Sequence, residues 1–318
     1  MSASVLVTLG AGFIGSHVCG LYRDRGWEVV ALDSLVSGRR SNVPDGVELV
    51  EMDIRSDQLD DLFRRRGFDL VNHHAAQIDV RVSVDRPRHD ASVNVDGLLN
   101  VLEAAREHGT ERVVFISSGG VVYGETDRLP ITEDVPKRPL SPYGVTKLTG
   151  EHYLHYYREV HGLEAVSLRY SNVYGPRQDP HGEAGVVAIF ARNLLDGTPL
   201  TIFGDGEQTR DYVFVGDVAR ANLLASEMEL PDAGDPDDVA YNVGTGREVS
   251  VNELARTLME ATGREVAMNR EPARPGELRR NALDPGRLRD RGWSPSTELA
   301  EGLRRTVDHI AATEFSTA

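Results

Sequence analysis

Residues 5–15 read VLVTLGAGFIG, and the topology of the chain can be worked out from this segment. Its first residues are apolar or β-branched, as in a buried strand, and a helical pattern begins at Phe13. Gly12 allows the backbone to approach a pyrophosphate, and Gly15 allows the helix to pack closely on the strand. Because a helix N-terminus attracts negative charge, the segment predicts a dinucleotide site.

Further along the chain, short apolar runs alternate with helical patterns. The predicted strands are Val5–Thr8, Val29–Leu32, Val47–Met52, Leu70–His74, Val113–Ser117 and Ala165–Arg169. The predicted helices are Phe13–Gly26, Ser56–Gly67, Asp90–Gly109 and Tyr143–Gly162. Such alternation implies crossover connections, so we predict an α/β fold with a doubly wound parallel sheet, covered on both faces, over residues 1–175.

The pattern changes after Gly175, where Pro and Gly become frequent. Pro199–Phe203 and Tyr212–Val215 are short predicted strands, and Pro231–Asp238 is a predicted surface loop. We therefore expect residues 176–318 to form mainly a smaller substrate-binding domain, with some segments returning to the main sheet.

The composition restricts the partners. The 318 residues include 50 acidic and 35 basic side chains, for a formal net charge of -15. This charge disfavours nucleic acid and acidic membrane surfaces as partners. The single cysteine, Cys19, cannot form an intrachain disulfide, and neither a signal-peptide pattern nor a membrane-spanning apolar run is present. We expect a soluble, cytoplasmic protein.

The second predicted strand is followed by Asp33, 18 residues after Gly15. A carboxylate at this place can accept hydrogen bonds from the adenosine ribose and would repel a 2′-phosphate. Asp33 thus favours NAD over NADP, although Arg39 and Arg40 lie nearby in the sequence.

Tyr143 and Lys147 lie four residues apart at a predicted helix start, after Ser141-Pro142. Residues at this spacing share one helix face, so the ammonium can lie near the phenol. A nearby cation stabilises phenolate and lowers the tyrosine pKa from its ordinary value of about 10. The pair can therefore exchange a proton with a hydroxyl group while hydride leaves the same carbon.

With these motifs the chain resembles the extended short-chain dehydrogenase/reductase family, and within it the nucleotide-sugar epimerases and dehydratases. The resemblance covers nearly the whole chain. It is carried by Gly12–Gly15, Asp53-Ile54, His74–Ala76, Asn94, Ser117–Gly124, Pro142–Lys147, Arg169–Arg177, Arg210–Tyr212 and Arg274–Glu277.

The resemblance implies NAD as cofactor and a UDP-sugar as substrate. The implied catalytic residues are Tyr143, Lys147 and Ser118. The implied NAD site comprises Gly10, Gly12, Phe13, Ile14, Gly15, Asp33, Ser34, Ser37, Gly38, Asp53, Ile54, His74, Ala75, Ala76, Gln77, Asn94, Ser117, Tyr143, Lys147, Tyr170, Asn172 and Val173. The implied substrate site comprises Ser118, Gly119, Tyr143, Asn172, Ile202, Phe203, Arg210, Arg274, Glu277 and Asn281. In that site Arg210 and Arg274 would bind the diphosphate, which suits the planar fork of guanidinium donors.

The chain departs from the family pattern at two positions. Leu9 replaces the first glycine of the dinucleotide motif, so we expect an ordinary backbone conformation at this residue. Gly119 stands where the family carries a serine or threonine that bonds the sugar hydroxyl. Ser118 is the nearest candidate for that role, and a water or the substrate itself is the alternative.

The residues after Gly119 bear on the reaction. Dehydratases of the family carry an Asp-Glu pair there, and related decarboxylases a glutamate, whereas this chain has Gly120 and Val121, which cannot transfer a proton. Oxidation at C4 and return of hydride to the other face of the ketone remain, so a UDP-glucose or UDP-galactose type of 4-epimerisation is expected. A small residue at Asn281 would admit N-acetylated hexoses.

Several alternatives stay open. They are a uronate 4-epimerase, another nucleotide-sugar oxidoreductase such as a 4-ketosugar reductase, and a non-enzymatic NAD sensor. His73 and His74 lack the carboxylates or cysteines that would accompany a metal site, so no metal is expected. By the same resemblance, a homodimer would form through the helices Asp90–Gly109 and Tyr143–Gly162.

Overall fold

The computed structural model describes residues 3–180, 185–232, 234–273 and 278–314. The chain forms two compact units, each built from more than one segment. Unit 1 comprises Met1–Gly124, Glu133–Tyr170 and Ala219–Asn242. Unit 2 comprises Glu125–Thr132, Ser171–Val218 and Val243–Ala318. The predicted boundary after residue 175 differs from this division, because residues 219–242 return to unit 1 and residues 125–132 belong to unit 2.

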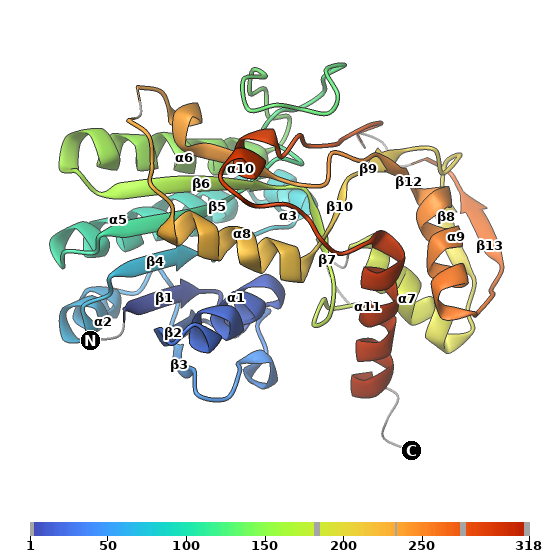
Figure 1. Cartoon of the computed structure of the whole chain (residues 1–318), viewed down its shortest axis with the longest axis horizontal. Coiled ribbons are helices and arrows are strands. Elements are labelled where there is room, and N and C mark those ends of the chain that lie inside the picture. Colours follow the sequence, from blue (N-terminus) through green and yellow to red (C-terminus); the bar gives the residue numbers. More distant parts are fainter. Residues whose placement is uncertain (1–2, 181–184, 233, 274–277, 315–318) are drawn as a thin grey trace. The chain divides into compact units, whose positions relative to one another are not determined.

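Unit 1 is built on a seven-stranded sheet with the order β11-β6-β5-β4-β1-β2-β3 (Figure 1). Its strands are β1 (Ser4–Thr8), β2 (Glu28–Asp33), β3 (Glu48–Glu51), β4 (Leu70–His73), β5 (Arg112–Ser118), β6 (Glu164–Tyr170) and β11 (Ala240–Val243). The pairs from β3 through β6 are parallel, as predicted. The chain order reverses on either side of β1, and ligands of such sheets bind at the carboxyl ends of the strands at this point.

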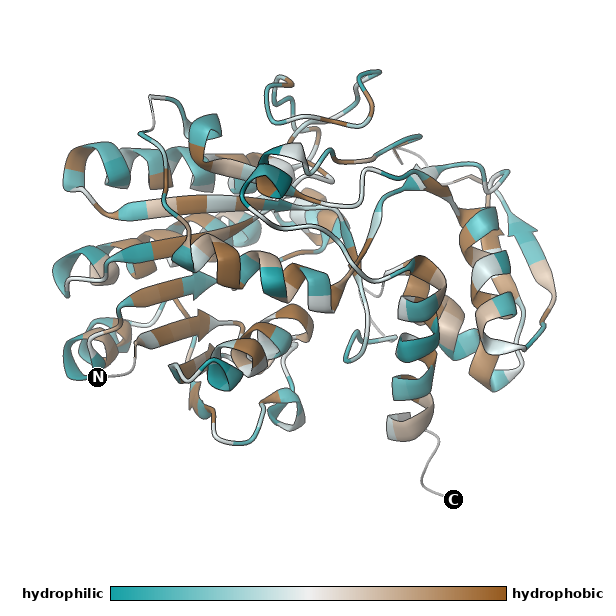
Figure 2. Cartoon of the chain, in the orientation of Figure 1, coloured by the Kyte–Doolittle hydropathy of each residue, from teal (hydrophilic) through white to brown (hydrophobic). Residues whose placement is uncertain are grey.

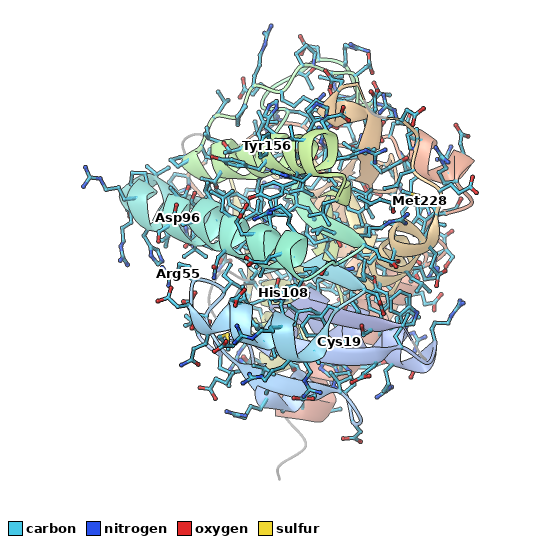
Figure 3. The ribbon with its side chains drawn as sticks, turned by 90° about the vertical axis from the view of Figure 1, so that its left-hand side faces the viewer. Cys19, Arg55, Asp96, His108, Tyr156 and Met228 are labelled. Atoms are coloured by element: carbon cyan, nitrogen blue, oxygen red, sulfur yellow. The ribbon has the colours of Figure 1, made fainter. Side chains whose placement is uncertain are left out.

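Helices cover both faces of this sheet, which explains its hydrophobic interior strands such as β1 (Figure 2). On one face, α2 (Gln58–Arg66), α5 (Gly97–Glu107) and α6 (Pro142–His161) share a core with Phe63, Leu98, Phe115 and Leu154. Figure 3 looks onto these helices and labels His108 after α5 and Tyr156 on α6. On the other face, Tyr22 of α1 (Phe13–Asp24) is bonded to Ser226 of α8 (Val215–Glu227) at 2.7 Å.

The predicted helix Asp90–Gly109 is not uniform. The segment runs from α3 (Val80–Asp85) and α4 (Pro87–Ala91) through a π-helical turn, Ser92–Asp96, into α5. The wide turn carries Asn94, whose Oδ1 accepts a hydrogen bond from the backbone N–H of Gln77 at 2.8 Å. Turns of this kind are frequent at functional sites.

Unit 2 contains three two-stranded sheets and helices. The strand pairs are β7 (Asn172–Tyr174) with β10 (Tyr212–Phe214), β8 (Leu200–Phe203) with β13 (Met268–Glu271), and β9 (Thr209–Arg210) with β12 (Val249–Ser250). The helices are α7 (Val186–Asp196), α9 (Val251–Thr262), α10 (Gly286–Asp290) and α11 (Leu299–Glu314). The two predicted strands of this region thus correspond to β8 and β10.

Two short 3₁₀ helices complete the described elements. Arg40–Asn42 follows β2. Pro236–Val239 overlaps the end of the predicted loop Pro231–Asp238, and Asp235 and Asp238 form a capping box there. No helix in the described ranges has both the length and the apolar character that crossing a bilayer requires.

Candidate active site

The glycine turn between β1 and α1 is tightly packed. A Cβ at Gly15 would lie 2.2 Å from the carbonyl oxygen of Leu9, and one at Gly10 would lie 2.6 Å from the Cβ of Ala31. The backbone N–H of Gly12 donates to the oxygen of Leu9 at 3.0 Å. These short distances leave no room for side chains at Gly10 and Gly15, so backbone N–H groups of the turn before α1 are accessible to a ligand.

The prediction for the backbone of Leu9 was wrong. We expected an ordinary backbone conformation at Leu9, but its φ is +55°, which is in the left-handed region. The turn from β1 into α1 demands this conformation, and a residue with a Cβ adopts it at a cost of about 1–2 kcal/mol. The chain thus keeps the turn of the dinucleotide motif while paying a conformational penalty at its first position.

Asp33 is buried at the end of β2. Its Oδ2 accepts from the backbone N–H of Ala11 at 3.0 Å, and its Oδ1 accepts from that of Leu35 at 2.8 Å. Burial raises the pKa of Asp33, and these two backbone bonds oppose the rise. A Cβ at Gly38 would lie 2.5 Å from the carboxylate, so glycine is needed there. A carboxylate has about four acceptor positions, so Asp33 can still bind ribose hydroxyls.

Other predicted NAD residues surround this edge of the sheet. Ser34 and Ser37 are exposed in the loop after β2, and Phe13, Ile14 and Gly15 begin α1. Asp53 follows β3 and is paired with Arg55, which lowers the pKa of its carboxyl. The carbonyl oxygen of Ile54 accepts from Asn100 at 2.6 Å.

The end of β4 carries His73, His74, Ala75 and Ala76. His73 Nδ1 lies 3.1 Å from Thr8 Oγ1, which accepts from the N–H of Ala75 at 3.0 Å. Burial lowers the pKa of both histidines to about 3, with the positive charge of Lys147 acting in the same direction. Both rings are therefore neutral at physiological pH. Within the described residues, no three His, Cys, Asp or Glu side chains are arranged to hold a metal ion.

The residues of unit 1 fit a bound NAD molecule. The glycine turn has no side chains that would keep a ligand away from its backbone, and Asp33 can accept further hydrogen bonds. His74 Nε2 is buried without a hydrogen-bond partner among the described residues. A buried polar atom without a partner is costly unless a ligand satisfies it.

The start of α6 places Tyr143 and Lys147. Ser141 caps the helix by accepting from the N–H of Gly144 at 3.1 Å, and Pro142 occupies its first turn. The Nζ atom of Lys147 lies 5.9 Å from the centre of the Tyr143 ring and donates to the carbonyl oxygen of Ile116 at 2.8 Å. The helix and β5 therefore hold the ammonium beside the phenol.

The Ser118 side chain, at the end of β5, acts on the phenol of Tyr143. Burial raises the pKa of Tyr143, and Ser118 opposes that rise. Burial also lowers the pKa of Lys147 to about 8, while Asp90 and Glu151 act to raise it. The pKa of Tyr143 is therefore raised and not lowered as the neighbouring cation predicted, because burial has the largest effect on the phenol.

The turn after Ser118 has no proton-transferring side chain at the next positions. Gly119, Gly120 and Val121 follow β5, and the N–H groups of Val121 and Val122 both donate to the oxygen of Ser118, at 3.2 and 3.0 Å. A Cβ at Gly120 would lie 3.6 Å from Ser118 Oγ, so glycine at this position leaves the space next to the serine hydroxyl open.

Four polar residues of this region were not among the predicted site residues: Asp90, Thr146, Glu151 and Arg169. Ser117 Oγ donates to Glu151 Oε1 at 2.5 Å, and Glu151 forms a buried ion pair with Arg169. Thr146 and Asp90 are bonded to each other at 2.8 Å. The spacing of Lys147 and Glu151, one helical turn apart, is the one sequence feature that could have indicated Glu151.

Tyr170 and Gln77 lie among buried polar groups of unit 1. The Tyr170 hydroxyl accepts from Asn222 at 2.5 Å, and its ring lies 6.5 Å from that of His74. The side chain of Gln77 donates to Asp90 Oδ1 at 2.9 Å.

Unit 2 contains the remaining predicted ligand residues. Asn172 and Val173 lie in β7 and pair with β10. Ile202 and Phe203 end β8, and Arg210 ends β9 with its Nη1 donating to the oxygens of Thr209 and Leu278 at 2.8 and 2.9 Å. Asn281 is 1 % exposed. Arg274 and Glu277 lie outside the described residues.

Comparisons with known proteins place these features in context. The model of the NAD dependent epimerase/dehydratase family matches residues 5–244. A UDP-glucose 4-epimerase of Mycolicibacterium smegmatis is 46 % identical over 95 % of this chain and 97 % of its own length.

Two solved structures are similar to this one. The UDP-glucose 4-epimerase of Thermotoga maritima, solved with UDP-glucose, has a TM-score of 0.92 at 41 % identity, covering 98 % of this chain and 99 % of that one. The UDP-glucose 4-epimerase of Thermus thermophilus, in complex with NAD, has a TM-score of 0.90 at 46 % identity with the same coverage.

Proposed function

Since the chain belongs to the NAD-dependent epimerase/dehydratase family, we propose that it interconverts UDP-glucose and UDP-galactose by inverting the sugar at C4. The observation that carries this proposal is the buried ammonium of Lys147 beside the Tyr143 ring, with Ser118 at the end of β5 and Gly120 and Val121 after it. The similar UDP-glucose 4-epimerases support the choice of substrate.

In the proposed mechanism Tyr143 removes the proton of the C4 hydroxyl, which Ser118 holds through a hydrogen bond. Burial raises the pKa of Tyr143, and the ammonium of Lys147 beside the ring would oppose this rise by stabilising the phenolate. The chemistry that bound NAD supplies is reversible removal of hydride from C4. Tyr143 then returns the proton to the oxygen after the 4-keto sugar has presented its other face.

The residues after Ser118 favour epimerisation over loss of water. Dehydration at C5 and C6 needs an acid and a base beside the sugar, and neither glycine nor valine supplies one. A non-enzymatic NAD sensor would need neither Tyr143 nor a buried Lys147 beside it, so an enzyme explains this site better.

We further propose that the nucleotide binds to residues of unit 2. We infer that Arg210, with Arg274, binds the diphosphate, that Phe203 contacts the base, and that Asn172 contacts the phosphates. Asp211 next to Arg210 is fully buried and accepts from Thr245 and Leu283, which fixes the strand that carries the arginine. Holding the nucleotide while the sugar turns would keep one substrate bound through both half-reactions.

A homodimer in the cytoplasm is also part of this proposal. Val145, Tyr156 and Val160 of α6 are 49 %, 46 % and 60 % exposed, and large apolar side chains on one helix favour a protein partner. A second copy, pairing through α5 and α6, would cover them. Cys19, the single cysteine of the sequence, is compatible with a reducing compartment.

The experiment incubates the purified protein with UDP-galactose and follows the C4 proton by NMR, with UDP-glucuronate and UDP-N-acetylglucosamine in parallel. We expect UDP-glucose to form up to the equilibrium ratio without net consumption of NAD. A Lys147→Met variant, similar in length but uncharged, serves as the matched inactive control. Accumulation of a 4-keto-6-deoxy sugar, or net NADH formation, would contradict the proposal.

A further inference from the structure

Lys147 has an unusual environment for a cation. Its side chain is buried, with Nζ 5.0 Å from the centre of the Phe115 ring, and Nζ donates to the Ile116 oxygen. No carboxylate is hydrogen-bonded to it among the described residues. Burial lowers the pKa of Lys147 to about 8, so its charge depends on what else lies nearby.

Within the described residues Asp90, near the end of α4, is a buried carboxylate without a cationic partner, just as Lys147 is a buried cation without a carboxylate partner. It is 0 % exposed and forms no ion pair within the described part of the chain. Its oxygens accept from Gln77 Nε2 at 2.9 Å, Asn94 Nδ2 at 3.1 Å and Thr146 Oγ1 at 2.8 Å. These neutral donors solvate a carboxylate without neutralising its charge.

Asp90 is attached to the catalytic helix at an informative place. Thr146 directly precedes Lys147, and its Oγ1 also lies 3.1 Å from the carbonyl oxygen of Tyr143. The carboxylate is therefore bonded to the turn of α6 that separates the two catalytic residues. Gln77 and Asn94 hold its other side from the loop after β4 and from the π-helical turn.

We propose that Asp90 is the counter-charge of Lys147: its buried carboxylate keeps the lysine protonated while leaving Nζ without a salt bridge. The inference rests on the proposed function for the roles of Tyr143 and Lys147. Lysine has three donors, and one is used by the Ile116 oxygen. A counter-charge held by neutral donors leaves the others for a ligand.

The other charged groups around Lys147 do not take this role. Glu151 lies one turn further along α6, but its carboxylate is bonded to the guanidinium of Arg169 on β6. His73 at the end of β4 and His74 directly after it are neutral, and burial raises the pKa of Tyr143. Of the two carboxylates that raise the pKa of Lys147, Asp90 has the larger effect.

The same charge acts on Tyr143 in the opposite chemical sense. A negative Asp90 raises the pKa of the tyrosine, so it opposes phenolate while favouring ammonium. Removing the charge should therefore lower both pKa values. In a bell-shaped profile of kcat/KM against pH, both limbs would move to lower pH.

The test uses the composition of the chain, because Lys137 and Lys147 are its two lysines. Lysine labelled with ¹³C at Cε gives two NMR signals, and Lys137→Arg identifies them. In the wild type we expect the Lys147 signal to titrate near or above pH 8. In Asp90→Asn we expect its midpoint to fall by about one pH unit.

Two further variants separate charge from hydrogen bonding. Thr146→Val removes a donor to Asp90 but keeps the carboxylate, so its Lys147 midpoint should not fall. Asp90→Ser, which leaves space for a water among the donors, is a second neutral variant in case the asparagine folds poorly.

An unchanged Lys147 midpoint in a folded neutral variant would overturn the inference, as would a wild-type lysine that already titrates below pH 7. The titration needs no substrate. It therefore distinguishes failure of this inference from failure of the proposed reaction, which the NMR assay of UDP-galactose measures separately.

Discussion

The glycine turn at the start of α1 and the catalytic turn at the start of α6 are built in opposite ways. The first is made of backbone from one continuous segment, and its shape follows from missing side chains at Gly10, Gly12 and Gly15. The second depends on groups that come from α4, β5 and α6. Binding of a diphosphate can thus be encoded locally, whereas tuning of a proton transfer needs several distant segments.

The largest effect is expected at the catalytic turn. Tyr143→Phe removes the hydroxyl that transfers the proton and should lower kcat by about a hundredfold or more. The protein should still fold and bind NAD, because the glycine turn is untouched. Steady-state kinetics and NAD titration check both statements, and near-normal turnover would remove Tyr143 from the mechanism.

Gly15→Ala tests the glycine turn in the same manner. The added methyl would lie 2.2 Å from the Leu9 oxygen, so we expect about 2 kcal/mol of lost stability together with weaker NAD binding. Urea unfolding and calorimetric NAD titration measure the two effects.

Gly20→Ala is the matched control in the same helix. Its nearest contact would be Pro44 at 3.6 Å, and alanine favours helix by about 1 kcal/mol. If both variants lost equal stability, the tight packing at Gly15 would not be the cause.

Ser118→Ala examines whether this serine replaces the hydroxyl missing at Gly119. Losing one hydrogen bond to the reacting groups should lower kcat/KM by about tenfold. Ser118 lowers the pKa of Tyr143, so its replacement should move the acid limb of the pH profile to higher pH. Ser118→Thr keeps the hydroxyl and should retain most activity; a profile that stays in place in the alanine variant would assign the role to another group.

The smallest effect is expected at Leu9. Leu9→Gly relieves a left-handed leucine but makes the unfolded chain more flexible, so the two terms nearly offset and stability should change by less than about 1 kcal/mol. Leu35, with φ of +56°, provides a second site for the same substitution. A large loss of stability at Leu9 would show that its side chain contributes more than its backbone costs.

These differences explain what the sequence could predict. The parallel sheet and the helices α1, α2 and α6 follow from local periodicity, and Asp33 follows from its distance to the glycine motif. The left-handed Leu9 was missed because leucine seldom adopts that conformation.

The partners of Asp90 could not be predicted for a different reason. Asp90 is 13 residues from Gln77 and 56 from Thr146, and no periodic pattern links positions so far apart. The return of residues 219–242 to unit 1 is equally invisible to local patterns. Long-range contacts of this kind are set by the folded topology.

The two backbone hydrogen bonds that Asp33 accepts affect any attempt to change the coenzyme preference. The carboxylate that would exclude a 2′-phosphate also ties the loop at Ala11 to the loop at Leu35. A substitution that admits the phosphate leaves two backbone donors without an acceptor, so selectivity and loop anchoring cannot be altered separately at this residue. An engineer would need a compensating acceptor for both amides before judging whether the altered pocket accepts NADP.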